Sequence, residues 1–499
     1  MSNLADRGRR LGAQGLRSYL TRAASSSREV LSNAVGQLRT GKGVRALGLT
    51  CVLLIAAGFF LGFVDRSYPI REWLFFRYAG YWAVVLVWGA GSFGVGYGLL
   101  TRVFRVRFGL LTEALLSFTL GQLAFEYLLF LVGLCQGYRA FAFYLVPLAF
   151  LALGGGGLLA LLRRTQRILA RPAPPRSLLR FATLAFGCAA LGMIYFLILT
   201  PDNVQFDARW KHMALAEDYA AHGGIHRSPE GWMFAARPHI TSYLYAWAFL
   251  IPSGRLFDQM LLGAHLEYFA FLVSTVLGIP ALVRRLVPRA DPAVVWAARF
   301  LFPGVLLYDS SLSGGTDHFG ALYAIPIAIV LLRSWRDFTA RTLSLLATLL
   351  AGPVLVKETA ALLLVPFPLL VVGTRFVTDL WQRLRTRSAS DGPSATLSPA
   401  RPFWLAPLVA IGTGLLVTTP LWLKNLVWYG DPLYPSLHRF FPSHPWSEAA
   451  AYKLKWAYSE RQMWAPKHDL QGLIATLKAL FTYSFVPNNW KALHRDVPV

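Results

Sequence analysis

Long apolar segments alternate with short polar segments, many rich in arginine, along most of this chain. A helix that crosses a bilayer needs about 20 consecutive, mainly apolar residues, because the hydrocarbon core is about 30 Å thick. The pattern therefore predicts an all-α polytopic membrane protein with about eleven transmembrane helices. We expect these helices at residues 46–64, 78–100, 109–134, 140–162, 180–200, 259–283, 293–310, 318–333, 342–356, 358–374 and 403–424.

The composition supports this prediction and narrows the function classes. Of the 499 residues, 55% are hydrophobic and only 15% are charged, whereas a soluble domain carries about 25% charged residues. The net charge of +24 does not indicate nucleic-acid binding here, because the arginines flank apolar segments. The three cysteines lie in apolar runs without metal or redox spacing, so no disulfide framework is expected.

The distribution of basic residues predicts the orientation. Short cytoplasmic loops carry an excess of Lys and Arg, and residues 1–45, 101–108 and 163–180 are strongly basic. We therefore expect a multi-pass protein of a bacterial cell inner membrane with a cytoplasmic N-terminal arm. The stretch 375–402 also carries arginines and is rich in Ser, Pro and Gly, which predicts a flexible cytoplasmic linker.

The remaining segments divide the chain into domains. N-terminal transmembrane helices occupy 46–200, an extracytoplasmic loop 201–241, a transmembrane core 242–424, and an extracytoplasmic tail 425–499, where the chain is expected to be truncated or to depend on a partner. At the end of this loop, the short apolar stretch 238–252 is expected to lie in the membrane interface or to dip into the bilayer.

The run 342–374 allows two interpretations. It forms either two short spans with Lys357 and Glu358 at their outer tip, or one tilted helix. A single helix would bury both charges in the bilayer and turn the basic stretch 375–402 outward, and both consequences are energetically costly. We therefore favour two spans.

The loop 201–241 carries the first candidate for chemistry, Asp207. The residues after it predict an amphipathic surface helix that ends at Gly223 and Gly224. An aspartate at the mouth of a helix bundle can serve as a general base. The alternative is that Asp207 only stabilises a helix N-terminus.

Other polar residues are expected at the same outer face, where Lys and Arg could hold a phosphate group. Each taken singly is also explained by anchoring at the membrane surface. The candidates for substrate binding are His212, Arg237, Asp317, His318, Lys357, Glu358, Lys424, Asn425 and Tyr434.

Two further patterns do not support a site by themselves. His222 and His226 have the spacing of metal ligands on a helix, but Gly223 and Gly224 interrupt it and no third ligand is evident. No metal-ligating residues are assigned, and dependence on a divalent metal is left open. The sequence GAGSFG (89–94) matches a dinucleotide motif, but it lies inside an apolar span without a preceding strand, so close helix packing is predicted instead.

Three separated motifs resemble those of the polytopic GT-C glycosyltransferases, the superfamily that includes protein mannosyltransferases and aminoarabinose transferases. The resemblance covers roughly residues 180–440. It is carried by Asp207, Ala208, His212, Ala216, Tyr219 and residues 223–225, by VKETA (356–360), and by Asn425, Gly430, Pro432, Tyr434 and Pro435.

This resemblance implies a GT-C-like fold and transfer of a sugar from a polyprenyl-phosphate donor to an extracytoplasmic glycan, lipid or protein. Asp207 takes the position of the catalytic base of an inverting reaction. Lys357 and Lys424 would neutralise the leaving lipid phosphate. The chain departs from the family in its tail and in its N-terminal spans.

Two other functions are compatible with the same sequence. A transporter or flippase of lipid-linked glycans should show an internal repeat and charged groups near the bilayer midplane, and neither is evident. An inactive GT-C-like scaffold would fit the short tail, but the presence of Asp207 argues against it.

Overall fold

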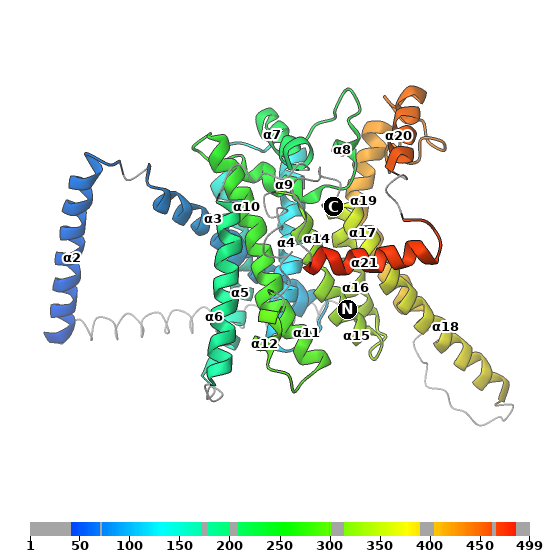
Figure 1. Ribbon diagram of the computed structural model, residues 1–499, viewed down its shortest axis with the longest axis horizontal. Helices are drawn as coiled ribbons and strands as arrows, with labels where there is room; N and C mark the ends of the chain where they lie inside the picture. The colour runs from blue at the N-terminus through cyan, green and yellow to red at the C-terminus, as the bar shows by residue number, and fades with distance from the viewer. Residues whose placement is uncertain are drawn as a thin grey trace, which may run out of the picture. The chain divides into compact units, whose positions relative to one another are not determined.

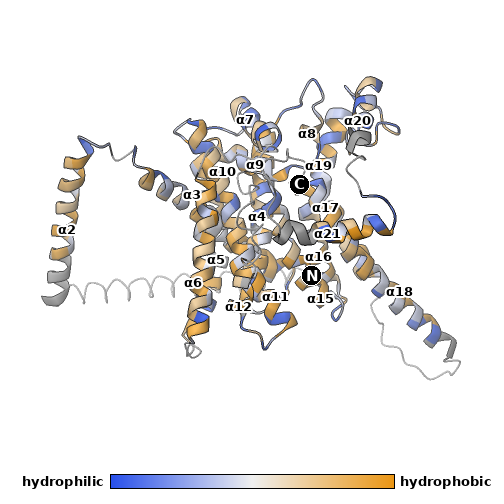
Figure 2. Cartoon of the chain, in the orientation of Figure 1, coloured by the Kyte–Doolittle hydropathy of each residue, from blue (hydrophilic) through white to orange (hydrophobic). Residues whose placement is uncertain are grey.

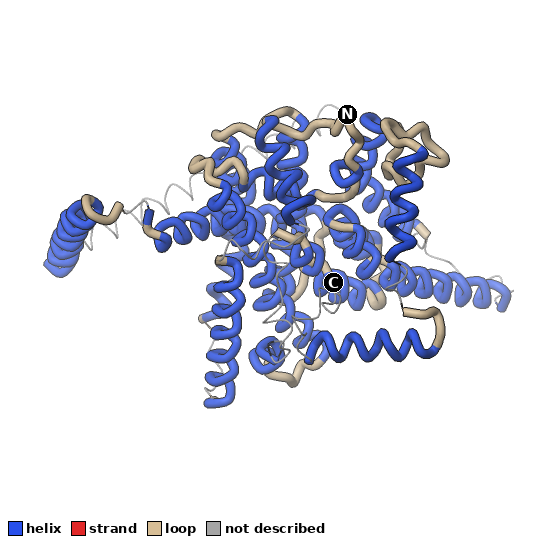
Figure 3. Tube along the Cα trace, turned by 45° about the horizontal axis from the view of Figure 1, so that its top comes forward, coloured by secondary structure: helices blue, strands red, loops and turns tan. Residues whose placement is uncertain are grey.

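The structure, a computed structural model, describes residues 41–69, 72–170, 177–199, 208–298, 300, 314–389, 404–461 and 466–485. These residues are helical or in loops, without a strand among them (Figures 1 and 3). The chain forms two compact units, residues 1–80 and 81–499. The first contains α2 (Gly41–Asp65) and the start of α3 (Leu74–Gly98), and the second contains all the helices that follow.

The helices of the second unit follow one another along the chain in this order. After α3 come α4 (Leu110–Leu134), α5 (Ala142–Leu169), α6 (Leu178–Ile198), α7 (Met213–His222), α8 (Met233–Ala236), α9 (Ile240–Ala248), α10 (Leu256–Leu272), α11 (Ile279–Leu286), α12 (Pro292–Ala298), α14 (Asp317–Ala321), α15 (Ala324–Ser334), α16 (Ala340–Val356), α17 (Glu358–Leu364), α18 (Pro366–Ala389), α19 (Leu405–Tyr429), α20 (Glu448–Arg461) and α21 (Leu470–Phe485).

Within the described ranges, nine helices are long and apolar enough to cross a membrane (Figure 2). The protein is therefore a polytopic helical membrane protein, as the hydropathy pattern predicts. The predicted number of eleven is not reached in the described part. Helix α16 has 17 residues and falls short of the span length, and the predicted span 293–310 is described only as far as Ala298 and at Phe300.

Helix α4 lies at the centre of the second unit, in contact with α5, α9, α11, α15 and α16. Glycines let the backbones of neighbouring helices approach closely. A Cβ atom added to Gly154 of α5 would lie 2.8 Å from the backbone nitrogen of Val95, and one on Gly121 of α4 would lie 2.8 Å from the Cα of Ser92. The glycine-rich segments of α3 and α5 thus serve helix packing, as predicted.

The helix predicted after Asp207 is present as α7. A π-helical turn, Ala208–His212, leads into it, and Gly223 ends it with a positive φ of 77°. Its buried side includes Leu215 and Tyr219, and this side packs against α9.

Two neighbouring segments differ from the expected pattern. All nine residues of α9 are buried inside the protein, so this part of the stretch 238–252 belongs to the protein core. Helix α18 continues to Ala389, so the first part of the expected linker 375–402 is helical. Residues 375–389 contain neither Gly nor Pro, so the helix continues through the basic residues in spite of their polar composition.

Candidate functional site

Lys357 lies at a break between two helices. Helix α16 ends at Val356, Lys357 has an extended backbone (φ −163°, ψ 141°), and α17 begins at Glu358. The start of α14 packs against both helices at this point (Figure 1). The break therefore presents two consecutive charged side chains, Lys357 and Glu358, at the junction of three helices.

The two charged residues at the break form ion pairs with different parts of the chain. The Nζ of Lys357 lies 2.8 Å from Oδ1 of Asp317, the first residue of α14, and 3.4 Å from the carbonyl oxygen of Gly315. The Oε1 of Glu358 lies 3.3 Å from Nε of Arg237, in the turn between α8 and α9. Two pairs thus connect three segments that are distant in sequence.

His212 joins this group from the N-terminal end of α7. It is fully buried, with Nε2 3.3 Å from the hydroxyl of Thr316 and Nδ1 3.3 Å from the hydroxyl of Ser242. Burial, followed by the positive charges of Lys211 and Lys357, holds the pKa of His212 well below its ordinary value. The imidazole is therefore neutral at physiological pH, with one ring nitrogen as a hydrogen-bond donor and the other as an acceptor.

A second buried histidine, His239, lies beside the first. Its Nε2 is 3.2 Å from the hydroxyl of Tyr219. Burial, followed by the charge of Lys424, lowers its pKa to about 3. The charge of Lys211 lowers the pKa of both histidines, that of Lys357 acts on His212, and that of Lys424 acts on His239. We call His212, Arg237, Asp317, Lys357 and Glu358 the Lys357 cluster.

Glu267 of α10 holds the loop that carries Asp317. Its carboxylate is fully buried and accepts hydrogen bonds from the hydroxyl of Tyr245 at 2.9 Å, the backbone nitrogen of Gly314 at 3.0 Å and that of His318 at 3.4 Å. His318 thus binds through its backbone, and its ring packs edge-on against Phe271. Glu267 thus holds the backbone on both sides of Asp317 and positions this member of the cluster.

The end of α19 adjoins the cluster. Lys424 is buried, donates to the carbonyl oxygen of Ala235 at 3.1 Å, and lies 5.1 Å from the centre of the Trp428 ring. Asn425 donates to the carbonyl oxygens of Ala236 at 2.7 Å and Pro432 at 3.3 Å. Both residues thus anchor the segment that leads into Arg237.

Tyr434 does not join the Lys357 cluster. Its ring stacks on Tyr429 with centres 4.5 Å apart, and its hydroxyl donates to the carbonyl oxygen of Gly231 at 3.1 Å. Burial raises its pKa to about 12. The loop around it is held by Asp431, whose carboxylate accepts from the backbone nitrogens of Leu433 and Leu437. These contacts give Tyr434 a packing role.

The structure therefore brings together most of the predicted polar residues from four separate segments. Asp207 lies outside the described residues and immediately precedes Ala208. Thr316, Ser242 and Glu267 were missed by sequence analysis. Glu267 could have been found, because an ionisable residue inside an apolar span is a functional candidate by default, whereas Ser242 and Thr316 carry no such signal.

Comparisons with protein-family models, with curated proteins and with solved structures gave no match.

Proposed function

We propose that this protein is a membrane glycosyltransferase that moves a sugar from a polyprenyl-phosphate donor to an extracytoplasmic acceptor with inversion. The observation that carries the proposal is the concentration of Lys211, Arg237, Lys357 and Lys424 around two buried neutral histidines. Such a group suits a phosphate, because ammonium and guanidinium groups stabilise the charge that develops on the leaving oxygen.

The charges around the phosphate position support this assignment. Asp317 pairs with Lys357, and Glu358 pairs with Arg237. Lys424 donates to a backbone carbonyl oxygen and lies over an aromatic ring. A phosphate could replace the carboxylates at Lys357 and Arg237 without leaving either cation unpaired. Replacing the two carboxylates by a phosphate would break the ion pairs of Lys357 and Glu358, so donor binding would be coupled to a change in conformation between α16 and α17.

An apolar groove offers room for the lipid tail of such a donor. It has a volume of about 630 Å³ and lies between α4, α16 and α19, with the end of α3 beside it. Its wall includes Thr348 of α16 and Pro420 of α19. Because a helix rises about 1.5 Å per residue, Pro420 is about 6 Å along α19 from Lys424. An isoprenoid chain in this groove could therefore place its phosphate near the cationic group.

The proposed reaction balances without a cofactor. Asp207 accepts the proton of the acceptor hydroxyl, the oxygen attacks the anomeric carbon from the side opposite the phosphate, and the bond between that carbon and the phosphate oxygen breaks. Polyprenyl phosphate leaves with the electron pair, next to Lys357 and Lys424. The orientation expected from the basic loops puts this site outside the cytoplasm.

The test measures sugar transfer in membranes that contain a radiolabelled polyprenyl-phosphate sugar pool. Asp207→Asn should abolish transfer, and Lys357→Gln should lower it about 100-fold, in line with the loss of one group that stabilises transition-state charge. Lys455→Gln, the same change at an exposed lysine of α20, is the matched control. Gel filtration shows whether each variant remains folded.

Two outcomes would contradict the proposal in different ways. Full transfer by a folded Asp207→Asn variant would remove Asp207 as the base. Absence of transfer by the wild type, together with movement of the labelled lipid between leaflets of a vesicle, would replace the enzyme with a transporter.

A further inference from the structure

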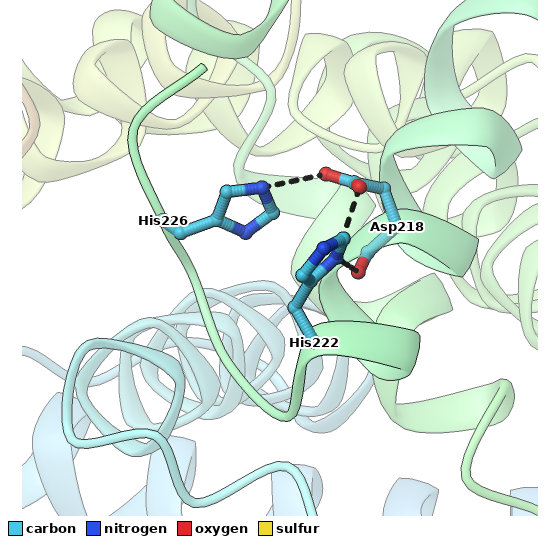
Figure 4. Close-up of side chains that lie close together, drawn as sticks. All are labelled: Asp218, His222 and His226. Atoms are coloured by element: carbon cyan, nitrogen blue, oxygen red, sulfur yellow. Dashed lines mark hydrogen bonds and ion pairs between the residues drawn. The ribbon is translucent and has the colours of Figure 1, made fainter. Parts of the chain in front are cut away.

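A separate group of metal-ligand type lies at the C-terminal end of α7. Asp218 and His222 are one turn apart on the helix, and His226 follows the turn at Gly223 and Gly224. One ligand atom from each of the three residues lies within 4.8 Å of those of the other two. Figure 4 shows the Asp218 carboxylate beside the two imidazole rings, with a dashed line to each.

Two of the separations between ligand atoms are close to the edge length of a small coordination polyhedron. Oδ1 of Asp218 lies 3.1 Å from Nδ1 of His222, and Oδ2 lies 3.3 Å from Nε2 of His226. A tetrahedral ion with bonds of 2.0 to 2.1 Å separates its ligand atoms by roughly 3.3 Å. The ring centres of His222 and His226 are 4.3 Å apart, so both rings can approach one ion.

The backbone holds this arrangement without help from an ion. The carbonyl oxygen of Gly223 accepts from the backbone nitrogen of Tyr138, and the backbone nitrogen of Ile225 donates to the carbonyl oxygen of Gly133, both at 2.9 Å. The side chain of Gln136 also donates to the carbonyl oxygen of Ile225 at 2.9 Å. The turn between the two histidines is thus fixed to the end of α4, which pre-organises the ligands.

The exposure of the three side chains is suited to ion entry. The side chain of His222 is 61% exposed, that of Asp218 35% and that of His226 30%. His226 is backed by the ring of Tyr219, which lies edge-on at 5.9 Å. One side of the group is therefore packed against the protein, and the other remains open for a water ligand.

We propose that Asp218, His222 and His226 bind a divalent first-row transition-metal ion, with Zn²⁺ as the reference ion. Two imidazoles and one carboxylate favour this class over Mg²⁺ or Ca²⁺, which prefer oxygen ligands. The ion adds one more connection between the end of α7 and the turn that follows it. This site is distinct from the Lys357 cluster and does not depend on the proposed glycosyl transfer.

The test uses the full-length protein without an affinity tag, purified in detergent at pH 8 and stripped of metal. Titration with Co²⁺ should produce visible absorption bands that saturate at about one equivalent per chain, because nitrogen ligands in a low-symmetry site intensify them. Calorimetric titration with Zn²⁺ gives the affinity. Asp218→Asn, His222→Ala and His226→Ala should each weaken Zn²⁺ binding about 100-fold, since loss of even an outer-shell partner weakens sites by 10 to 100-fold.

His444→Ala is the matched control, because His444 is exposed and lies in a different loop. It should leave the affinity and the Co²⁺ spectrum unchanged. Melting temperatures without metal show whether the variants fold, and Zn²⁺ should raise the melting temperature of the wild type but not of the His226→Ala variant. Equal binding by the wild type and all three variants, or a wild type with only millimolar affinity, would overturn the proposal.

Discussion

Helix α4 and the span formed by α17 and α18 have similar hydropathy but very different surroundings. The most apolar 18 residues have a mean hydropathy of 1.7 in the span Leu110–Leu134 and 2.0 in the span Glu358–Arg385. Of these residues, 72% are buried in the protein in the first span and only 6% in the second. Hydropathy therefore identifies a span but does not show whether the span faces protein or lipid.

Polar side chains distinguish the two spans. Helix α4 buries Glu113, Ser117, Thr119, Gln122 and Glu126 completely. The hydroxyl of Tyr323, in the turn between α14 and α15, lies 3.3 Å from Oε1 of Gln122. The outer span instead exposes large apolar residues, with Leu362 at 73% and Leu363 at 79%. Polar residues within a span thus mark contacts between helices, because lipid cannot satisfy them.

The largest effect should come from filling a close contact at the centre. Gly121→Val places a side chain against the backbone of Ser92, where even a Cβ has no room, whereas Gly155 of α5 has nothing within 4 Å of an added Cβ. We expect Gly121→Val to destabilise the protein by about 3 kcal/mol or to prevent folding, and Gly155→Val to change stability by less than about 0.5 kcal/mol. Gel filtration and melting in detergent measure both, and equal behaviour of the two variants would contradict the packing described for α3 and α4.

The second largest effect is the pH dependence of stability that comes from His239, the residue before α9. The pKa of His239 is about 3 in the folded protein, against an ordinary value of 6.5. Between these values the unfolded chain binds a proton that the folded protein does not, so stability falls as pH is lowered. From pH 6.5 to pH 5 the loss from this residue is at most about 2 kcal/mol.

His239→Gln should therefore flatten the pH dependence of the melting temperature below pH 6.5. The exposed His444 offers the control, and His444→Gln should retain the wild-type slope. An unchanged slope in the His239→Gln variant would show that this histidine is not buried in its neutral form.

The smallest effect compares two ion pairs. Arg164 of α5 pairs with Glu113, which is fully buried and also accepts from the backbone nitrogen of Phe108 at 2.9 Å. Arg375 pairs with Asp379 one turn away on α18. Arg164→Met should lower stability by about 1.5 kcal/mol, because it leaves a buried carboxylate with one partner.

Arg375→Met should cost at most about 0.5 kcal/mol, because a local pair on an outer helix contributes little. Melting of both variants in the same detergent makes the comparison. A larger loss from Arg375→Met than from Arg164→Met would mean that α18 has a partner that covers it.

The candidate site could be predicted only in part. Lys357, Asp317 and Arg237 were placed at one face from charge and position alone, and the structure shows the two ion pairs that link them. The role of Tyr434 was not foreseen, because stacking on Tyr429 depends on how the tail folds back. The third residue beside His222 and His226 was missed, because the glycines between them suggest separation whereas the turn they form brings His226 back to Asp218.

The sequence by itself determined that the chain is a polytopic helical membrane protein and that α7 ends at Gly223, and it favoured the helix break at Lys357. These features depend on local properties: the length of an apolar run, the conformational freedom of glycine and the cost of a charge in lipid. The tertiary structure alone decided which spans are buried, that Glu267 holds the loop before Asp317, and that α9 lies inside the protein. Those features depend on contacts between residues far apart in the chain, and no window of neighbouring residues contains them.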